Sequence, residues 1–156
     1  MRNRVWIGGT LLALVLPWAL VWLERPTAPV PEWCEVPYHV DNEGTQVASI
    51  AATIHARFRP DGSSSATLIG SVTVAGKPYR IHRLSELTWR RQGDFMLSTT
   101  HSVRTLAEDT VPGALAPHVL LSMAKEGHSD YYQMHPLPNG DQMIYFAGLP
   151  RLYCHT

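Results

Sequence analysis

The segment Thr45–Phe58, TQVASIAATIHARF, decides the fold that we expect for this sequence. Every second residue from Ala48 to Phe58 is apolar, and the residues between them are mostly polar. This period of two is the strongest pattern in the chain and is typical of a β-strand with one buried face. Many of the inward side chains are alanines, which suit the inner wall of a tightly curved barrel or of a cavity.

Further strands are expected on both sides of regular turn signals. The stretches RPDG (59–62), AGKP (75–78) and QGD (92–94) separate strands at 66–74, 79–91 and 95–106, which predicts an antiparallel meander. A short helix is expected within 107–123, then a hairpin about Asn139-Gly140 and a last strand at 149–154. With six or seven strands and one short helix, the sequence predicts an α+β fold, mainly antiparallel β. Its sheet must curl or be covered, because open edges invite pairing.

The N-terminal part of the sequence differs from the rest. Residues 1–4 are basic, and residues 5–23 carry no charge over about 28 Å of helix, close to the ~30 Å hydrocarbon core of a membrane. Trp6 lies near one end of this run, and Trp18 and Trp22 lie near the other, as interfacial anchors do. We expect a transmembrane anchor at 5–23, with residues 1–4 as a cytoplasmic stub. A cleaved signal peptide is the alternative, but the run is long and no Ala-x-Ala site follows it.

Two cysteines, Cys34 and Cys154, frame the β domain that we expect at 33–156, after a proline-rich spacer at 24–32. On the outer side of a membrane, an even number of cysteines favours a disulfide. Such a bond would restrict the unfolded chain by roughly 5 kcal/mol in the chain-entropy model. Two unrelated thiols are the alternative.

Charge and motif content exclude several classes of function. The chain has 13 basic and 13 acidic residues, so it lacks the basic surface typical of nucleic-acid-binding proteins. It contains no GxSxG, HExxH, P-loop or GxGxxG motif. Its histidines and cysteines lack metal-ligand spacing. We therefore expect no enzyme activity, no catalytic residue, no metal and no cofactor.

Arg83 is the most informative polar residue, because it interrupts the apolar face of the strand at 79–91. A charge on such a face needs a partner. Arg83 could bind an anionic ligand or a carboxylate inside a barrel mouth, or a β-bulge could return it to solvent. Together with Arg83, the residues expected to line a cavity are Ala52, Ile54, Ile81, Leu87 and Trp89.

Several features together resemble the FidL-like family of small enterobacterial membrane proteins. They are the basic N-terminus, the apolar run, Cys34 after it, the stretch FRPDGSSSATLIGSVTVAGKPYRIHR (58–83), VP (111–112) before a short apolar segment, and Cys154 in the last strand. The resemblance covers almost the whole chain. It implies a ToxS-like partner of a membrane-anchored winged-helix, ToxR-like transcription regulator. It also implies a lipocalin-like β-barrel in the periplasm, on a single-pass protein of the bacterial inner membrane. Some members of the wider group sense bile salts in the shared cavity.

The leading hypothesis is therefore a periplasmic co-regulator that binds a ToxR-like regulator by sheet completion, and stabilises it or signals to it. The chain itself would not touch DNA. The second hypothesis is a membrane-anchored binder of a small amphipathic ligand, such as a bile salt, that acts alone. The third is an envelope assembly factor.

Overall fold

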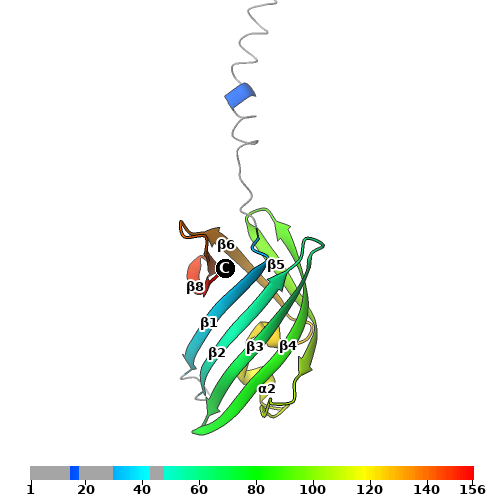
Figure 1. Ribbon diagram of the computed structural model, residues 1–156, viewed down its shortest axis with the longest axis vertical. Helices are drawn as coiled ribbons and strands as arrows, with labels where there is room; N and C mark the ends of the chain where they lie inside the picture. The colour runs from blue at the N-terminus through cyan, green and yellow to red at the C-terminus, as the bar shows by residue number, and fades with distance from the viewer. Residues whose placement is uncertain (1–14, 18–29, 43–47) are drawn as a thin grey trace, which may run out of the picture.

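The computed structural model describes residues 15–17, 30–42 and 48–156, and its main feature is one antiparallel sheet (Figure 1). The strands follow one another in chain order across the sheet. They are β1 (Trp33–Asn42), β2 (Ala48–Phe58), β3 (Ser63–Val74), β4 (Lys77–Gln92), β5 (Phe95–Thr105), β6 (Ser129–Pro136), β7 (Gln142–Phe146) and β8 (Leu149–Cys154). The predicted antiparallel meander is confirmed, and it curls into a nearly closed, lipocalin-like barrel.

The sheet has eight strands, so the expected count of six or seven is wrong. The strand that the sequence did not predict is β1, which contains Pro37, and a proline inside a run argues against a strand. Proline has no N–H group, so it is confined to edge strands and strand starts. β1 keeps Pro37 because, among the described residues, no strand pairs with the side of β1 that faces away from β2 at this position.

The disulfide that the cysteine count predicted is confirmed. Cys34 and Cys154 are joined, with their Cα atoms 5.3 Å apart, and both side chains are almost fully buried. Beside this bond, the backbones of Glu35 and His155 exchange two hydrogen bonds of 2.8 Å each. Together they fasten the last strand to the first and close the barrel at this point.

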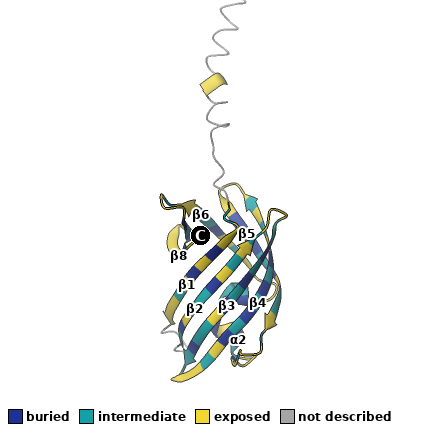
Figure 2. Ribbon diagram, in the orientation of Figure 1, coloured by how far each residue is buried: buried dark blue, intermediate teal, exposed yellow. Residues whose placement is uncertain are grey.

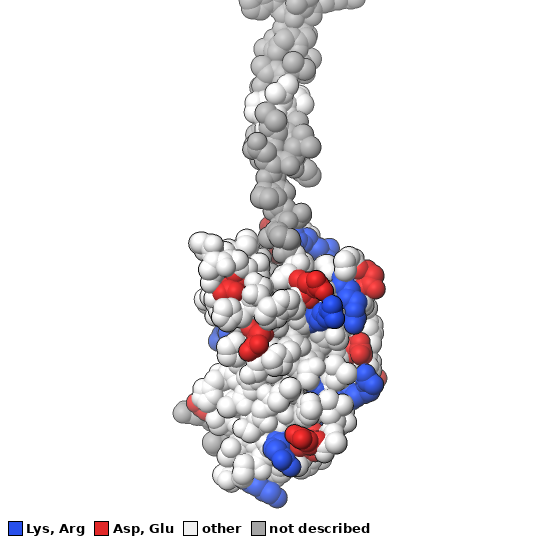
Figure 3. Space-filling view, viewed as in Figure 1, with Lys and Arg blue, Asp and Glu red and all other residues white. Residues whose placement is uncertain are grey.

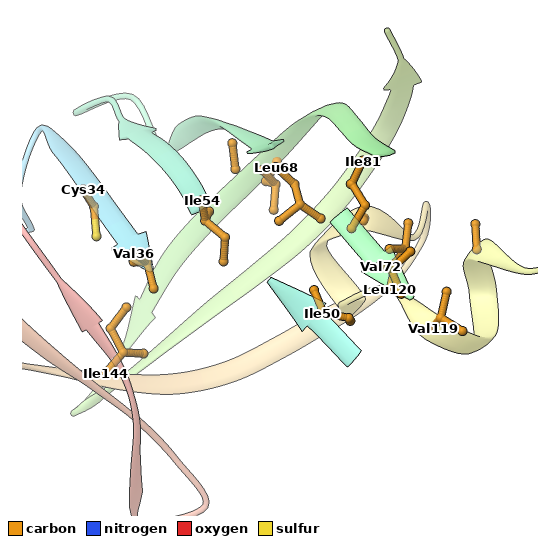
Figure 4. Close-up of a cluster of buried hydrophobic side chains, with 14 of the residues drawn as sticks. Cys34, Val36, Ile50, Ile54, Leu68, Val72, Ile81, Val119, Leu120 and Ile144 are labelled. Atoms are coloured by element: carbon orange, nitrogen blue, oxygen red, sulfur yellow. The ribbon is translucent and has the colours of Figure 1, made fainter. Parts of the chain in front are cut away.

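A short segment covers the opposite end of the barrel. The short helix expected within 107–123 is found as α2 (Ala116–Val119), and the 3-10 turn η1 (Ser122–Ala124) follows it. Gly113 and Pro117 stand in this stretch, and both residue types shorten helices. Figure 4 shows Val119 and Leu120 beside Ile50, Val72 and Ile81, which come from the strands. The helix therefore closes one end of the apolar core.

The core follows from the alternation of side chains along the strands. Buried and exposed residues alternate along β1 and β2 (Figure 2). The inward residues with almost no exposed surface come from several strands and include Leu68, Val72, Ile81 and Met96. Strands of this length and tilt enclose an interior that side chains fill, as expected for an eight-stranded barrel.

Gly70 allows an unusually close approach between β2 and β3. A Cβ atom added at this position would lie 2.3 Å from the carbonyl oxygen of Ala51 and 2.4 Å from the Cα atom of Ala52. Both atoms belong to the backbone, so the strands would have to move apart. This contact explains why a glycine stands in the middle of a long strand.

The predicted membrane anchor lies almost wholly outside the described residues. Trp6, Trp18 and Trp22 are among the residues that are not described, as are the stub at 1–4 and the spacer up to residue 29. Within the described ranges, no helix has the length and apolar character needed to span a membrane. The anchor at 5–23 stays a prediction.

We expect Gly70→Ala to lower the free energy of unfolding by about 1–3 kcal/mol, because the added methyl group overpacks the β2–β3 contact. Chemical denaturation monitored by circular dichroism measures this change. Gly113→Ala is the matched control, since an added Cβ there meets no atom within 4 Å. Equal stability of the two variants would contradict this account of Gly70.

Candidate functional site

The outer edge of β1 is the clearest functional feature of the described surface. β1 pairs with β2 over ten residues, from Trp33 to Asn42. On its other side, the only pairing among the described residues is the single bridge between Glu35 and His155. An unpaired strand edge is a template for another strand, and proteins usually shorten or cover it. Here the rest of β1 forms an open edge, which we define as Pro37–Asp41.

The direction of the backbone groups along this edge follows from the bridge. Both polar backbone groups of Glu35 point toward β8, because they bind His155. Backbone groups alternate between the two sides of a strand, so those of Pro37, His39 and Asp41 point the same way. The open edge therefore offers two N–H donors, at His39 and Asp41, and three carbonyl acceptors.

A hollow lies beside the open edge. It has a volume of about 280 Å³ and is half-open to solvent. One wall comes from the ends of β1 and β2, and the other comes from the segment around α2. Its lining residues are Tyr38, Val40, Asp41, Ala48, Ile50, His118, Val119, Leu120 and Leu121. A strand added to β1 would have room for a side chain in this hollow.

The barrel also contains an interior pocket of about 110 Å³, which is likewise half-open to solvent. Its walls are mainly apolar, and Ser98, Ser122, Asp130 and Tyr132 form a polar region on one side. Ser122 donates a hydrogen bond of 2.5 Å to Asp130. Burial raises the pKa of Tyr132 to about 12, and the nearby Asp130 carboxylate adds to this effect, so its hydroxyl is a neutral donor at physiological pH.

The structure does not bring the predicted cavity residues into one site. Ile54 and Leu87 line the interior pocket. Ile81 is buried in the core near α2, and Ala52 is partly buried on β2. Trp89 packs edge-on against Phe58 with ring centroids 6.2 Å apart, and its Nε1–H donates to the carbonyl of Ser63 at 3.2 Å.

Arg83 points into the barrel and finds its carboxylate within the same chain. Its Nε donates to Asp109 Oδ2 at 3.0 Å, and Nη2 lies 3.4 Å from Oδ1. Their side chains are 8% and 0% exposed, so this is a buried ion pair. The interpretation that a bulge returns Arg83 to solvent is wrong, because the bulge in β4 lies between Glu86 and Leu87.

Asp109 also orders the backbone around this ion pair. It accepts hydrogen bonds from the N–H groups of His82 and Val111 at 3.0 and 2.9 Å. Burial alone would raise the pKa of Asp109, but the hydrogen bonds from Arg83, His82 and Val111 outweigh it and hold the pKa below its ordinary value. The pair thus fixes the segment after β5 to the middle of β4.

A second polar cluster holds the C-terminus at the barrel seam, the place where the end of the chain meets β1. Asp141 is buried and accepts hydrogen bonds from the hydroxyl of Tyr153 and from the N–H of Thr156, and lies 3.0 Å from Nδ1 of His155. The bond from Tyr153 is the largest of the effects that lower the pKa of Asp141 to about 2. The cluster keeps His155 in place for its bridge to Glu35. The sequence analysis placed Asn139 and Asp141 only in a hairpin turn.

Within the described ranges, no group of three or more His, Cys, Asp or Glu side chains is placed to hold a metal ion. No protein-family model and no curated protein sequence matches this chain. The resemblance to the FidL-like family therefore stays a prediction.

We expect Asp109→Ala to destabilise the fold by about 3–5 kcal/mol, because it leaves the Arg83 guanidinium buried without its partner. Urea denaturation measures the change. Glu32→Ala is the matched control, since it breaks the ion pair with Arg57, in which both side chains are mostly exposed. That control should cost about 1 kcal/mol or less. Similar losses in both variants would contradict the assigned role of Asp109.

The low pKa of Asp141 predicts that the contact between the C-terminus and β1 becomes less stable in acid. Since folding lowers this pKa from 3.8 to about 2, the stabilisation is fully present above about pH 4 and is lost as the pH falls toward 2. Asp141→Asn should therefore flatten the dependence of unfolding free energy on pH between 4 and 2. Denaturation midpoints measured across this range test the prediction. An unchanged pH dependence in the variant would refute it.

Proposed function

We propose that this chain is a periplasmic co-regulator that binds a membrane-anchored, ToxR-like transcription regulator along the open edge of β1. The observation that supports it best is the unpaired edge at Pro37–Asp41 next to a half-open hollow. Addition of a strand to such an edge is a common mode of peptide recognition.

The chemistry of the edge defines what can bind. His39 and Asp41 offer backbone groups for an antiparallel or parallel strand, and backbone pairing supplies affinity without demanding a particular sequence. Specificity would come from the hollow, where Tyr38, Val40 and Leu120 are apolar and His118 is polar. An extended segment with an apolar side chain at one position fits this arrangement.

The interior pocket supports the partner hypothesis over the ligand hypothesis. Sites that enclose drug-sized ligands have volumes of about 300–1,000 Å³, and an apolar cavity of about 150 Å³ holds a benzene molecule. A pocket of about 110 Å³ is too small for a whole bile salt. A ligand of that size would fit only if the side chains that line the pocket moved apart.

Binding at the edge would also act on the regulator itself. A segment that joins the sheet exchanges solvent for backbone hydrogen bonds, and any partner that binds only the ordered form stabilises that form by mass action. The co-regulator would thus hold the outer part of the regulator in one conformation. That contact is the route by which a periplasmic signal reaches the regulator.

His39→Pro tests this function, because it removes one of the two N–H donors of the open edge and adds a bulky ring there. The β2 side of β1 does not use this donor, so the barrel should remain folded. We expect capture of a co-expressed winged-helix regulator from a neighbouring gene to fall by about tenfold or more. Co-purification in detergent, quantified by immunoblot, measures this.

His39→Ala is the matched control for that experiment. It removes the side chain and its exposed contact with Asp41, which spans 3.4 Å, but keeps the backbone donor. Capture should stay near the wild-type level. Equal capture by the proline variant and the wild-type protein, with both folded, would refute the proposed edge. Failure of the wild-type protein to capture the regulator would refute the function.

A further inference from the structure

We propose that the end of the barrel where β1 begins rests on the lipid surface of the membrane and holds the domain upright. We call this end the N-terminal rim and define it by Glu32, Trp33, the turn at 59–62 and the stretch from Arg90 to Phe95. This inference goes beyond the proposed function and shares with it only the predicted anchor.

Hydrogen bonds join the parts of the N-terminal rim to one another. The N–H of Phe58 donates to the carbonyl of Glu32 at 2.8 Å, and the N–H of Trp89 donates to the carbonyl of Gly62 at 2.7 Å. Arg57 forms an ion pair of 2.8 Å with Glu32. The start of β1, the β2–β3 turn and the end of β4 therefore form one continuous rim.

Exposed aromatic side chains gather at this end of the barrel. Trp33 is 52% exposed and Phe95 is 46% exposed, and each is the first residue of its strand. Tyr131 is 56% exposed and pairs with Leu97, two residues from Phe95. The other exposed large hydrophobic residues of the described domain are aliphatic: Val40, Ile69 and Leu149. Aromatic side chains favour the interface between lipid and water.

The two rim aromatics stand on opposite walls of the barrel. Trp33 belongs to β1 and Phe95 to β5, which are four strands apart in an order of eight. Side chains next to each one point inward, since Cys34 and Met96 are almost fully buried. Trp33 and Phe95 therefore face outward. Two contacts on opposite sides of the rim would keep the barrel from tilting until its axis lies parallel to the membrane.

The charges of the N-terminal rim suit a lipid headgroup region. Arg59 and Arg90 are exposed there, and Asp61 and Asp94 stand beside them. Figure 3 shows acidic and basic side chains side by side on the visible face, with no large area of one sign. Arginine binds phosphate with its planar fork of donors, whereas the mixed charge limits any purely electrostatic attraction. The aromatic side chains are therefore the main anchors.

The short stretch of chain before the domain is the reason to name the lipid surface as what the N-terminal rim contacts. Only six residues separate Leu23, the end of the predicted anchor, from Val30, where the described domain begins. The seven residue steps from Leu23 to Val30 span at most about 25 Å when the chain is extended. Two aromatic contacts alone bind a membrane weakly, but a short tether gives them a high effective concentration at its surface.

The full chain in nanodiscs of phosphatidylcholine and phosphatidylglycerol tests the proposal. Asp94→Cys places an environment-sensitive fluorophore on the N-terminal rim, and Lys77→Cys places it at the opposite end of the barrel. Mass spectrometry of each labelled protein checks that Cys34 and Cys154 remain joined. We expect blue-shifted emission and quenching by brominated lipid at position 94, and the emission of a water-exposed fluorophore at position 77.

A second pair of variants separates the contribution of the two aromatic side chains from that of the short chain that links the domain to the anchor. The double variant Trp33→Ser/Phe95→Ser should abolish the quenching at position 94. Ile69→Ser removes an exposed apolar side chain elsewhere and should leave the quenching unchanged. Water-exposed emission at both labelled positions would overturn the proposal, as would a chain that does not co-purify with the discs. Quenching that survives the double variant would overturn the role of the two aromatics.

Discussion

Closure at one seam is the constraint on which the rest of this structure depends. A meander of eight strands has two free edges, and a barrel removes them only if the first and last strands meet. Here they meet over one disulfide and one backbone bridge, which joins Glu35 of β1 to His155, the residue after β8. The Asp141 cluster orders the end of β8, so the seam is covalent, hydrogen-bonded and short. In the part of the chain that the structure describes, no strand pairs with the outer side of β1 beyond this bridge.

The alternating segment at β2 predicted the curled antiparallel sheet because its signal is local. Hydrophobic periodicity and turn residues act over a few positions, and β2 to β5 carry both clearly. β1 was not predicted because a proline inside a run argues against a strand, and the tolerance of β1 for Pro37 depends on which neighbours the strand has. That information exists only once the order of strands is known. The short length of α2 likewise follows from Gly113 and Pro117, which are visible in the sequence. The position of α2 over one end of the barrel depends on the tertiary fold and is not visible there.

The functional residues were less predictable, for a physical reason. Arg83 is an anomaly that the sequence reveals, since a charge on an apolar face needs a partner. Its partner, Asp109, lies 26 residues further on in a segment without regular structure. Nothing local separates that carboxylate from those that merely face solvent. The predicted cavity residues divide between places for a related reason: Ile54 and Leu87 line the pocket and the others do not, because one face of a long strand runs past several distinct regions of the barrel interior.

Pro37 has one more consequence, which concerns self-recognition. An open edge can pair with the same edge of a second copy, and in the two-fold arrangement centred on His39 each Pro37 would stand opposite Asp41 of the other molecule. The missing N–H would then leave the same bond unmade twice, once on each side of the symmetry axis. A different strand meets this missing donor only once, whereas a second copy of the same edge meets it twice. A single imino acid thus biases the edge away from its own copies and toward a foreign chain.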